Sequence, residues 1–302
     1  MQQRYADYTS DDQFSGALFA RAVVAGAQGG FGRTFCALLA ADGSDVTGID
    51  TRAAEDGRTH AIAADAAAPP PEALAALARA DVLVLCLPEA PLFAALEVLV
   101  RALPPGALVV DTTSVKSRYV AAVTELRDDV ELYSIEPMFA PDVGFAGQDL
   151  IAIPVRDGPR SQAFRGLLAT TGARVVEMSV DEHDRQAAAT QVAAHAALLA
   201  YGTVLRRLGF DPGAPSTPVQ RTLLALVARI ATRDAGVYWH IQRDNPHGPS
   251  GRAALRDALA ALDDLVARDD EAGFRALVAE TAEALGPDLA ALAQRSARIV
   301  QS

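Results

Sequence analysis

The chain has 302 residues, enough for two domains, and half of them are hydrophobic, which is ample for sizeable cores. Its net charge of −11 argues against nucleic acid and anionic membranes as partners. No apolar run approaches the length of a membrane span, and the polar, acidic residues 1–15 are unlike a secretory signal. Cys36 and Cys86 are interpreted as buried thiols, so we expect a cytoplasmic protein. No Cys/His cluster has metal-ligand spacing, so we expect no metal.

Apolar runs and helical patterns alternate through the first half of the chain. This predicts an α/β fold whose parallel sheet is doubly wound in the Rossmann manner. The predicted strands are 22–25, 46–50, 82–87, 108–111, 131–135, 150–154 and 174–178. The predicted helices are 31–41, 71–80, 90–103, 117–126 and 161–171. We therefore expect a nucleotide-binding domain over residues 1–178, of which 1–20 form an N-terminal extension.

The strand pattern stops after Met178. Residues 181–208 predict one long helix, capped by Ser179 or Asp181 and ended near Gly209. Further helices are predicted at 218–233, 252–268, 271–285 and 287–300, with loops at 211–217 and 244–251. Residues 179–302 thus predict an all-helical second domain.

A glycine cluster follows the first predicted strand, and the second predicted strand ends at Asp50. This order of strand, tight turn, helix, strand and acid is what a dinucleotide site needs. Gly29 would let the backbone approach a pyrophosphate, and Gly32 would let the helix pack closely on the strand. Ala27 stands where G-x-G-x-x-G has its first glycine, and Gly26 precedes it.

Asp50 can accept hydrogen bonds from both ribose hydroxyls, and its charge would repel a 2′-phosphate. We therefore expect NAD rather than NADP as the cofactor, although the nearby Arg52 opposes this preference. Leu87-Pro88, 111–116 and 135–142 each follow a predicted strand and are expected at the nicotinamide end of one cleft. The predicted cofactor-binding residues are Gly26, Ala27, Gln28, Gly29, Gly30, Phe31, Gly32, Asp50, Leu87 and Pro88.

Several separated segments together resemble the prephenate dehydrogenases, the NAD(P)-dependent enzymes of tyrosine biosynthesis. The resemblance runs from about Ala22 to about Arg298, and its motifs keep the family's order. The segments are the glycine turn, Asp111-Thr112-Thr113-Ser114-Val115-Lys116, Pro137-Met138-Phe139-Ala140-Pro141-Asp142, Glu182-His183-Asp184, Gln191 with His195, and Arg221 with Arg229. The resemblance implies a small-molecule substrate and a homodimer formed through the helical domain.

The family oxidises a cyclohexadiene: hydride leaves C4 for the nicotinamide, a carboxylate departs as carbon dioxide, and the ring becomes aromatic. By resemblance, Arg221 and Arg229 anchor substrate carboxylates, for which planar guanidinium groups are suited. Ser114, as a catalytic residue, and Lys116, as a substrate ligand, would lie beside the nicotinamide. Lys116 is also the only lysine of the chain. The remaining implied residues are the substrate-binding Gln191 and the catalytic His195.

The chain departs from the family at one catalytic position. Where the family usually reads His-Pro-Met, this chain reads Glu136-Pro137-Met138, and that histidine is the family's catalytic group. Three explanations compete: an inactive NAD-binding regulatory protein, a prephenate enzyme that uses a carboxylate as base, or a substrate with a different C4 substituent. Retention of Arg221, Arg229 and Lys116 argues against the first.

Acid–base matching favours a different C4 substituent. Imidazole has a pKa of about 6.5 and a glutamate carboxyl about 4.3, so glutamate is the weaker base for an alcohol. An amine at C4 would arrive as a cation, which a carboxylate can hold and deprotonate. Glu136 therefore predicts 4-amino-4-deoxyprephenate as substrate and 4-aminophenylpyruvate, an antibiotic precursor, as product. The β-hydroxyacid dehydrogenases share the domain plan, but they need a lysine that residues 181–208 lack.

Overall fold

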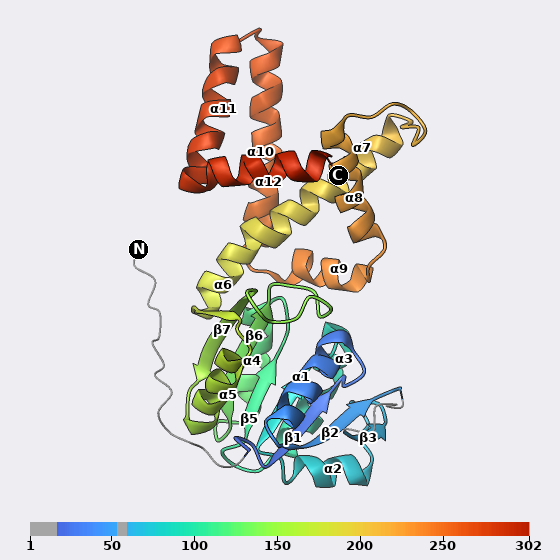
Figure 1. Ribbon diagram of the computed structural model, residues 1–302, viewed down its shortest axis with the longest axis vertical. Coiled ribbons are helices and arrows are strands. Elements are labelled where there is room, and N and C mark those ends of the chain that lie inside the picture. Colours follow the sequence, from blue (N-terminus) through green and yellow to red (C-terminus); the bar gives the residue numbers. More distant parts are fainter. Residues whose placement is uncertain (1–16, 53–58, 302) are drawn as a thin grey trace. The chain divides into compact units, whose positions relative to one another are not determined.

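The structure is a computed structural model that describes residues 17–52 and 59–301 (Figure 1). Most of the expected N-terminal extension therefore lies outside the described residues. The chain divides into two compact units, Met1–His183 and Asp184–Ser302. The first contains the sheet and its covering helices, and the second is helical.

One eight-stranded sheet organises the first unit, in the order β3-β2-β1-β4-β5-β6-β7-β8. All neighbouring strands are parallel except β6 and β7, so the expected parallel, doubly wound sheet is confirmed apart from this one antiparallel pair. The connection between these two strands contains no helix, and a parallel pairing would need a longer crossover. The strands are β1 Arg21–Ala25, β2 Asp45–Asp50, β3 His60–Ala63, β4 Val82–Leu85, β5 Leu108–Asp111, β6 Glu131–Pro137, β7 Asp149–Arg156 and β8 Arg174–Glu177.

Helices cover both faces of this sheet, as a doubly wound fold requires. Leu77, Leu99 and Val123, from α2, α3 and α4, belong to the apolar core on one face. Phe35 and Phe164, from α1 and α5, belong to the core on the other. The helices are α1 Gly30–Ala41, α2 Pro71–Leu77, α3 Glu89–Arg101, α4 Lys116–Leu126 and α5 Pro159–Thr170.

The helical part begins with the long helix that the sequence predicts, and its bounds are Val180–Arg207. It is not α-helical throughout, because a π-helical segment, η1 Ala188–Ala193, separates α6 Val180–Ala187 from α7 Ala194–Arg207. One helix, α9 Ala235–Asp244, was not predicted from the sequence. The remaining elements are α8 Pro218–Ala231, α9 Ala235–Asp244, α10 Gly248–Ala267, α11 Glu271–Leu285, the 3₁₀ turn η2 Gly286–Asp288 and α12 Leu289–Gln301.

By length and composition alone, the 28-residue helix Val180–Arg207 could cross a membrane. No run of this length was expected from the sequence, and by that measure the expectation was wrong. The same measure is met by core helices of proteins that never enter a bilayer. Here the first turn carries Asp181, Glu182, His183 and Asp184, and the π-helical segment interrupts the regular helix.

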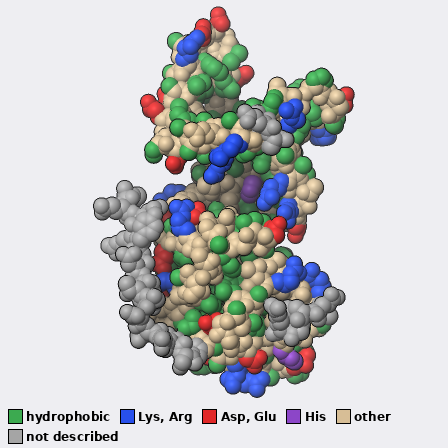
Figure 2. Space-filling model, in the orientation of Figure 1, with side chains coloured by type: hydrophobic (Ala, Val, Ile, Leu, Met, Phe, Trp, Pro, Cys, Tyr) green, Lys and Arg blue, Asp and Glu red, His purple; other side chains and the backbone are tan. Residues whose placement is uncertain are grey.

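The two units bury their apolar side chains to different degrees. The sheet unit contains nearly all of the buried hydrophobic residues, whereas those described after Asp184 are Ala187, Ala188, Val192, Ile230 and Ile241. Apart from Met138 and Val143, all exposed large apolar side chains in the described part lie between Leu199 and Ile299. Apolar side chains accordingly cover much of the visible surface of α10 and α11 (Figure 2). The helical unit thus leaves apolar surface uncovered in the single chain.

A buried ion pair joins two strand ends of the first unit. The Nζ atom of Lys116, the first residue of α4, lies 3.2 Å from Oδ2 of Asp111 at the end of β5, and both side chains are 0 % exposed. The same ammonium donates to the carbonyl oxygen of Ile135 in β6 at 2.7 Å. Thr113 adds its N–H and hydroxyl to the same Asp111 oxygen. The ammonium therefore ties the carboxyl ends of β5 and β6 together.

We expect Lys116→Met to lower the free energy of unfolding by about 3–5 kcal/mol, because Asp111 would become a buried charge without its cation. Urea denaturation measures the loss. Arg118→Met is the matched control: it removes an exposed cation from the same helix, where the guanidinium lies over Phe93, and should cost about 1 kcal/mol or less. Unchanged stability of Lys116→Met with a raised KM would instead make Lys116 a substrate ligand only.

Candidate active site

The glycine turn connects β1 to α1 at the carboxyl edge of the sheet. Gly26 has a positive φ of 79°, and a Cβ there would lie 2.4 Å from the carbonyl oxygen of Cys86, so the tight-turn role belongs to Gly26 rather than to the position of Ala27. A Cβ on Gly32 would lie 2.0 Å from the Gly26 oxygen, so only glycine lets α1 approach β1 this closely. α1 begins without a side-chain cap. Its first N–H groups suit a phosphate, and the turn fits a dinucleotide.

Asp50, at the end of β2, braces this turn. Its Oδ2 accepts the backbone N–H of Gln28 at 2.9 Å, and its Oδ1 accepts the N–H and Nε–H of Arg52. Burial acts to raise the pKa of Asp50, but these hydrogen bonds and the Arg52 charge outweigh it and hold the pKa below its ordinary value. A carboxylate has about four acceptor sites, so Asp50 can brace the turn and still accept ribose hydroxyls.

The loop after β6 packs against the start of α1. The rings of Phe31 and Phe139 meet edge to face with centroids 5.9 Å apart. A Cβ on Gly30 would lie 2.5 Å from Cγ of Pro141, so the proline ring fills the space that this glycine leaves. Residues of the family-like segment 137–142 therefore touch the glycine turn directly. This packing brings the end of β6 to the nucleotide edge of the sheet.

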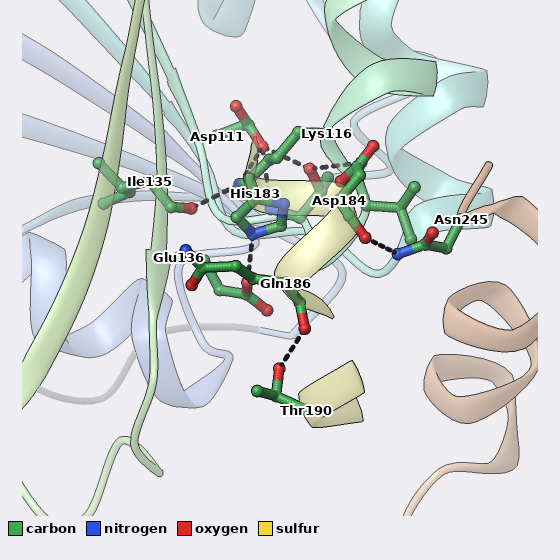
Figure 3. A network of polar contacts seen from close by, with 11 residues as sticks. Asp111, Lys116, Ile135, Glu136, His183, Asp184, Gln186, Thr190 and Asn245 are labelled. Carbon is green, nitrogen blue, oxygen red and sulfur yellow. Dashed lines mark hydrogen bonds and ion pairs between the residues drawn. The ribbon is translucent and has the colours of Figure 1, made fainter. Parts of the chain in front are cut away.

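Glu136 lies at this end of β6, and its side chain is 7 % exposed. Its Oε2 is 2.6 Å from Nε2 of His183, whose side chain is fully buried (Figure 3). This contact was not predicted, because the resemblance names Glu182-His183-Asp184 only as a shared segment and the cap was expected at Ser179 or Asp181. The cap is formed by Ser179 and Glu182, in reciprocal hydrogen bonds between each side chain and the other's backbone N–H. The only feature of the sequence that could have pointed to this contact is Glu136, which stands where the family has a histidine.

The other predicted residues of the first unit lie at the same edge of the sheet. Ser114 is half-buried in the loop between β5 and α4, Leu87 is half-buried after β4, and Pro88 is exposed just before α3. The strand order runs outward from β1 in one direction through β2 and β3, and in the other through β4 and β5. The topological switch point therefore lies between β1 and β4, and doubly wound sheets bind ligands at such a point. Lys116 contacts protein groups as described above, so direct contact between its ammonium and a substrate stays a prediction.

The π-helical segment shapes the second unit around Gln191 and His195. Gln242 of α9 donates to the carbonyl oxygen of Val192 at 2.8 Å, and a Cβ on Gly251 would lie 2.9 Å from the Ala188 oxygen. α9 and α10 therefore hold this non-α register, which is frequent at functional sites. Both Gln191 and His195 are half-buried.

His195 lies one residue into α7 and packs edge to face on Tyr238, with ring centroids 4.9 Å apart. Burial lowers the pKa of His195, which favours the neutral imidazole. Its Nδ1 is buried and has no hydrogen-bond partner among the described residues. A neutral ring with an unpartnered nitrogen is suited to a polar ligand rather than to an anion.

Arg221 and Arg229 both lie exposed on α8. Arg221 donates to the carbonyl oxygen of Ser216 at 3.1 Å. Within residues 17–52 and 59–301, Arg229 forms no ion pair, so its guanidinium is not neutralised by a carboxylate. An eight-residue spacing leaves the two side chains about 80° apart around the helix. Their predicted role as anion anchors is not tested by these contacts.

Comparison with known sequences identifies the first unit. Residues 37–176 match the family described as prephenate dehydrogenase, nucleotide-binding domain. A protein of Streptomyces pristinaespiralis called 4-amino-4-deoxyprephenate dehydrogenase is 43 % identical over 289 residues, which cover 94 % of this chain and 97 % of the relative. A probable arogenate/prephenate dehydrogenase of Methanocaldococcus jannaschii is 24 % identical over 191 residues, 61 % of this chain and 43 % of the relative.

Solved structures share the fold. Prephenate dehydrogenase from Aquifex aeolicus, in complex with hydroxyphenyl propionate and NAD⁺, has a TM-score of 0.71 at 19 % identity and covers 86 % of this chain and 95 % of its own. Arogenate dehydrogenase from Synechocystis has a TM-score of 0.63 at 16 % identity, over 86 % and 97 % of the two chains. The long match to the Streptomyces relative and the matching nucleotide-binding domain show that this chain belongs to the prephenate dehydrogenase family of oxidoreductases.

Proposed function

We propose that this protein oxidises 4-amino-4-deoxyprephenate with NAD⁺, releasing carbon dioxide and forming 4-aminophenylpyruvate. The observation that carries the proposal is the carboxylate of Glu136, buried at the end of β6 beside the glycine turn. The family's prephenate enzymes carry a histidine there by the resemblance described above. The Streptomyces relative, 43 % identical over nearly the whole chain, is named for this activity and supports the same substrate.

The charge of Glu136 explains how the site would discriminate at C4. An alkylammonium has a pKa of about 10, by analogy with lysine, so the amino substrate arrives as a cation. A buried carboxylate attracts this cation and forms a charge-assisted hydrogen bond with it. Glu136 then accepts the ammonium proton, which frees the nitrogen lone pair as hydride leaves C4. When bound, NAD⁺ supplies the hydride acceptor.

We propose that anion binding falls to the second unit. Arg229 and Arg221 would hold the two substrate carboxylates, because planar guanidinium groups pair with carboxylates in a fixed geometry. The half-buried Gln191 and the neutral His195 would contact uncharged polar parts of the substrate. Ser114 would lie beside the reacting carbon, close in sequence to Lys116, whose ammonium bonds Asp111 and the Ile135 carbonyl oxygen.

The helical unit supports the proposal of a homodimer. A groove of about 290 Å³ between α7 and α8 is lined mainly by apolar residues. Exposed apolar side chains continue over α8 to α12 with few buried residues beneath them. A second copy of the unit would cover this surface, because large exposed apolar patches mark interaction sites. Cys36 and Cys86 are both thiols, which suits the cytoplasm that we propose as the compartment.

For the substrate, we expect the wild-type kcat/KM, measured as NADH formation, to be higher with the 4-amino compound than with prephenate. Glu136→Gln keeps the shape and removes both charge and base, so it should lower turnover of the amino substrate by roughly 10²–10⁴-fold. Glu136→His should shift the ratio toward prephenate.

Glu131→Gln is the matched control, since Glu131 begins the same strand and accepts the N–H groups of Arg160 and Ser161 at its far end. Its kcat/KM ratio should equal that of the wild type. Better turnover of prephenate than of the amine by wild type would make Glu136 the base of a prephenate dehydrogenase. Turnover of neither substrate would leave a nucleotide-binding protein without this activity.

For the cofactor, we expect a higher kcat/KM with NAD⁺ than with NADP⁺, because the charge of Asp50 repels a 2′-phosphate. Asp50→Ala should lose about 10- to 100-fold with NAD⁺, the range of a lost charged hydrogen bond. Arg52, 63 % exposed and 3.2 Å from Asp50, opposes the preference, so Arg52→Ala should widen it. Equal use of both cofactors by wild type would show that Arg52 overrides Asp50.

For the assembly, sedimentation equilibrium should give about twice the chain mass of 31.6 kDa. Leu226→Asp places a charge on the exposed apolar surface of α8 and should shift the protein toward monomer. Val143→Asp places the same charge on an exposed apolar residue of the first unit and should leave the mass unchanged. A monomeric wild type at micromolar concentration would exclude the dimer.

A further inference from the structure

The Glu136–His183 contact joins two segments that neither the resemblance nor the proposed substrate connects. The two residues are 47 positions apart in the sequence, one on β6 and one on the first turn of α6. Both side chains are buried, and Nε2 and Oε2 are 2.6 Å apart. A separation this short is typical of a hydrogen bond with an ionised partner.

The local structure holds His183 firmly in this position. Its backbone N–H donates to the carbonyl oxygen of Ser179 at 3.0 Å. Ser179 and Glu182 form a reciprocal cap around the same turn, with the Ser179 N–H 2.8 Å from Oε2 of Glu182. The imidazole is therefore presented to Glu136 by a fixed helical turn rather than by a mobile loop.

The main chain of Glu136 is fixed from the other side. The carbonyl oxygen of Ile135, in the peptide bond that leads to Glu136, accepts the Lys116 ammonium at 2.7 Å. Lys116 thus holds the backbone at this point, and His183 contacts the side chain (Figure 3). With the preceding carbonyl bonded to Lys116 and the carboxylate bonded to His183, Glu136 is restrained at its main chain and at its side chain, and catalytic groups gain from such preorganisation.

We propose that His183 is the positioning residue of Glu136. In this arrangement Nε2–H of His183 donates to Oε2 of Glu136, which fixes the orientation of the buried carboxylate and aims it at the C4 substituent. His183 itself touches neither substrate nor cofactor. The proposal deepens the proposed function and rests on it for the identity of that substituent, but the hydrogen bond can be tested without any substrate.

The first experiment is a double-mutant cycle, with whichever cyclohexadienyl substrate the wild type turns over better. His183→Leu should lower kcat by about 10- to 100-fold with the KM for NAD⁺ unchanged, since a charged hydrogen bond is lost. His183→Gln should restore most of the rate, because its amide nitrogen can reach the place of Nε2. In the Glu136→Gln background, His183→Leu should have less than about a twofold further effect.

Independent losses at the two positions, or an unchanged kcat in a folded His183→Leu protein, would overturn the proposal. His60→Gln is the control, because His60 is exposed on β3 and should leave every parameter unchanged. Melting temperature and NAD⁺ affinity of each variant separate a positioning effect from a folding defect.

The second experiment needs no turnover, so it stands even where the proposed substrate fails. In ¹⁵N-histidine-labelled protein, which has five histidines, one ring N–H proton should resonate far downfield and exchange slowly with water. That signal should vanish in His183→Gln and move upfield in Glu136→Gln, while His60→Gln leaves it in place. Absence of such a signal, or its survival in His183→Gln, would overturn the hydrogen bond and with it the proposal.

Discussion

The buried ammonium of Lys116 is the contact on which the arrangement of the candidate site depends. It bonds a carboxylate at the end of β5 and a backbone oxygen at the end of β6, both out of contact with water. In such surroundings an ion pair is stabilising only when its hydrogen bonds are well formed, and Thr113 supplies two more to Asp111. The cation thereby sets the spacing of the strand ends that carry Ser114 and Glu136. The lone lysine of this arginine-rich chain thus lies where a compact ammonium is needed.

Burial of Glu136 follows from how the first unit packs. Phe31 and Pro141 hold the loop after β6 against the glycine turn, and the side chain of Glu136 at the end of this strand is 7 % exposed. A carboxylate in this setting must have a donor or a cation beside it, because an isolated buried charge is strongly destabilising. His183 contacts the carboxylate at 2.6 Å and is such a donor. In the proposed reaction, a positive C4 substituent would therefore be the better partner for Glu136.

Much of the fold was predictable because its signals are local. Buried strands such as β5 are short apolar runs, and Gly26, Gly29 and Gly32 mark the turn where backbone groups approach most closely. The misses have physical reasons: β3 is a four-residue edge strand with one buried residue, α9 mixes polar and apolar residues, and the π-helical register depends on hydrogen bonds from α9. The antiparallel direction of β7 was not predicted either, because the apolar pattern of a strand is the same whichever way the strand runs in the sheet. The His183 contact spans 47 residues, and no sequence spacing indicates it.

The Glu136–His183 pair also limits what one substitution can do in this chain. A histidine at position 136 would face a second imidazole, and two imidazoles share a hydrogen bond only when one of them is a neutral acceptor in the complementary tautomer. Two imidazolium ions would repel each other. A carboxylate at position 136 can accept the Nε2–H of His183 and still offers a second oxygen to an arriving ammonium. In the proposed reaction, discrimination at C4 would therefore depend on the residue at position 136 together with the His183 donor that meets it.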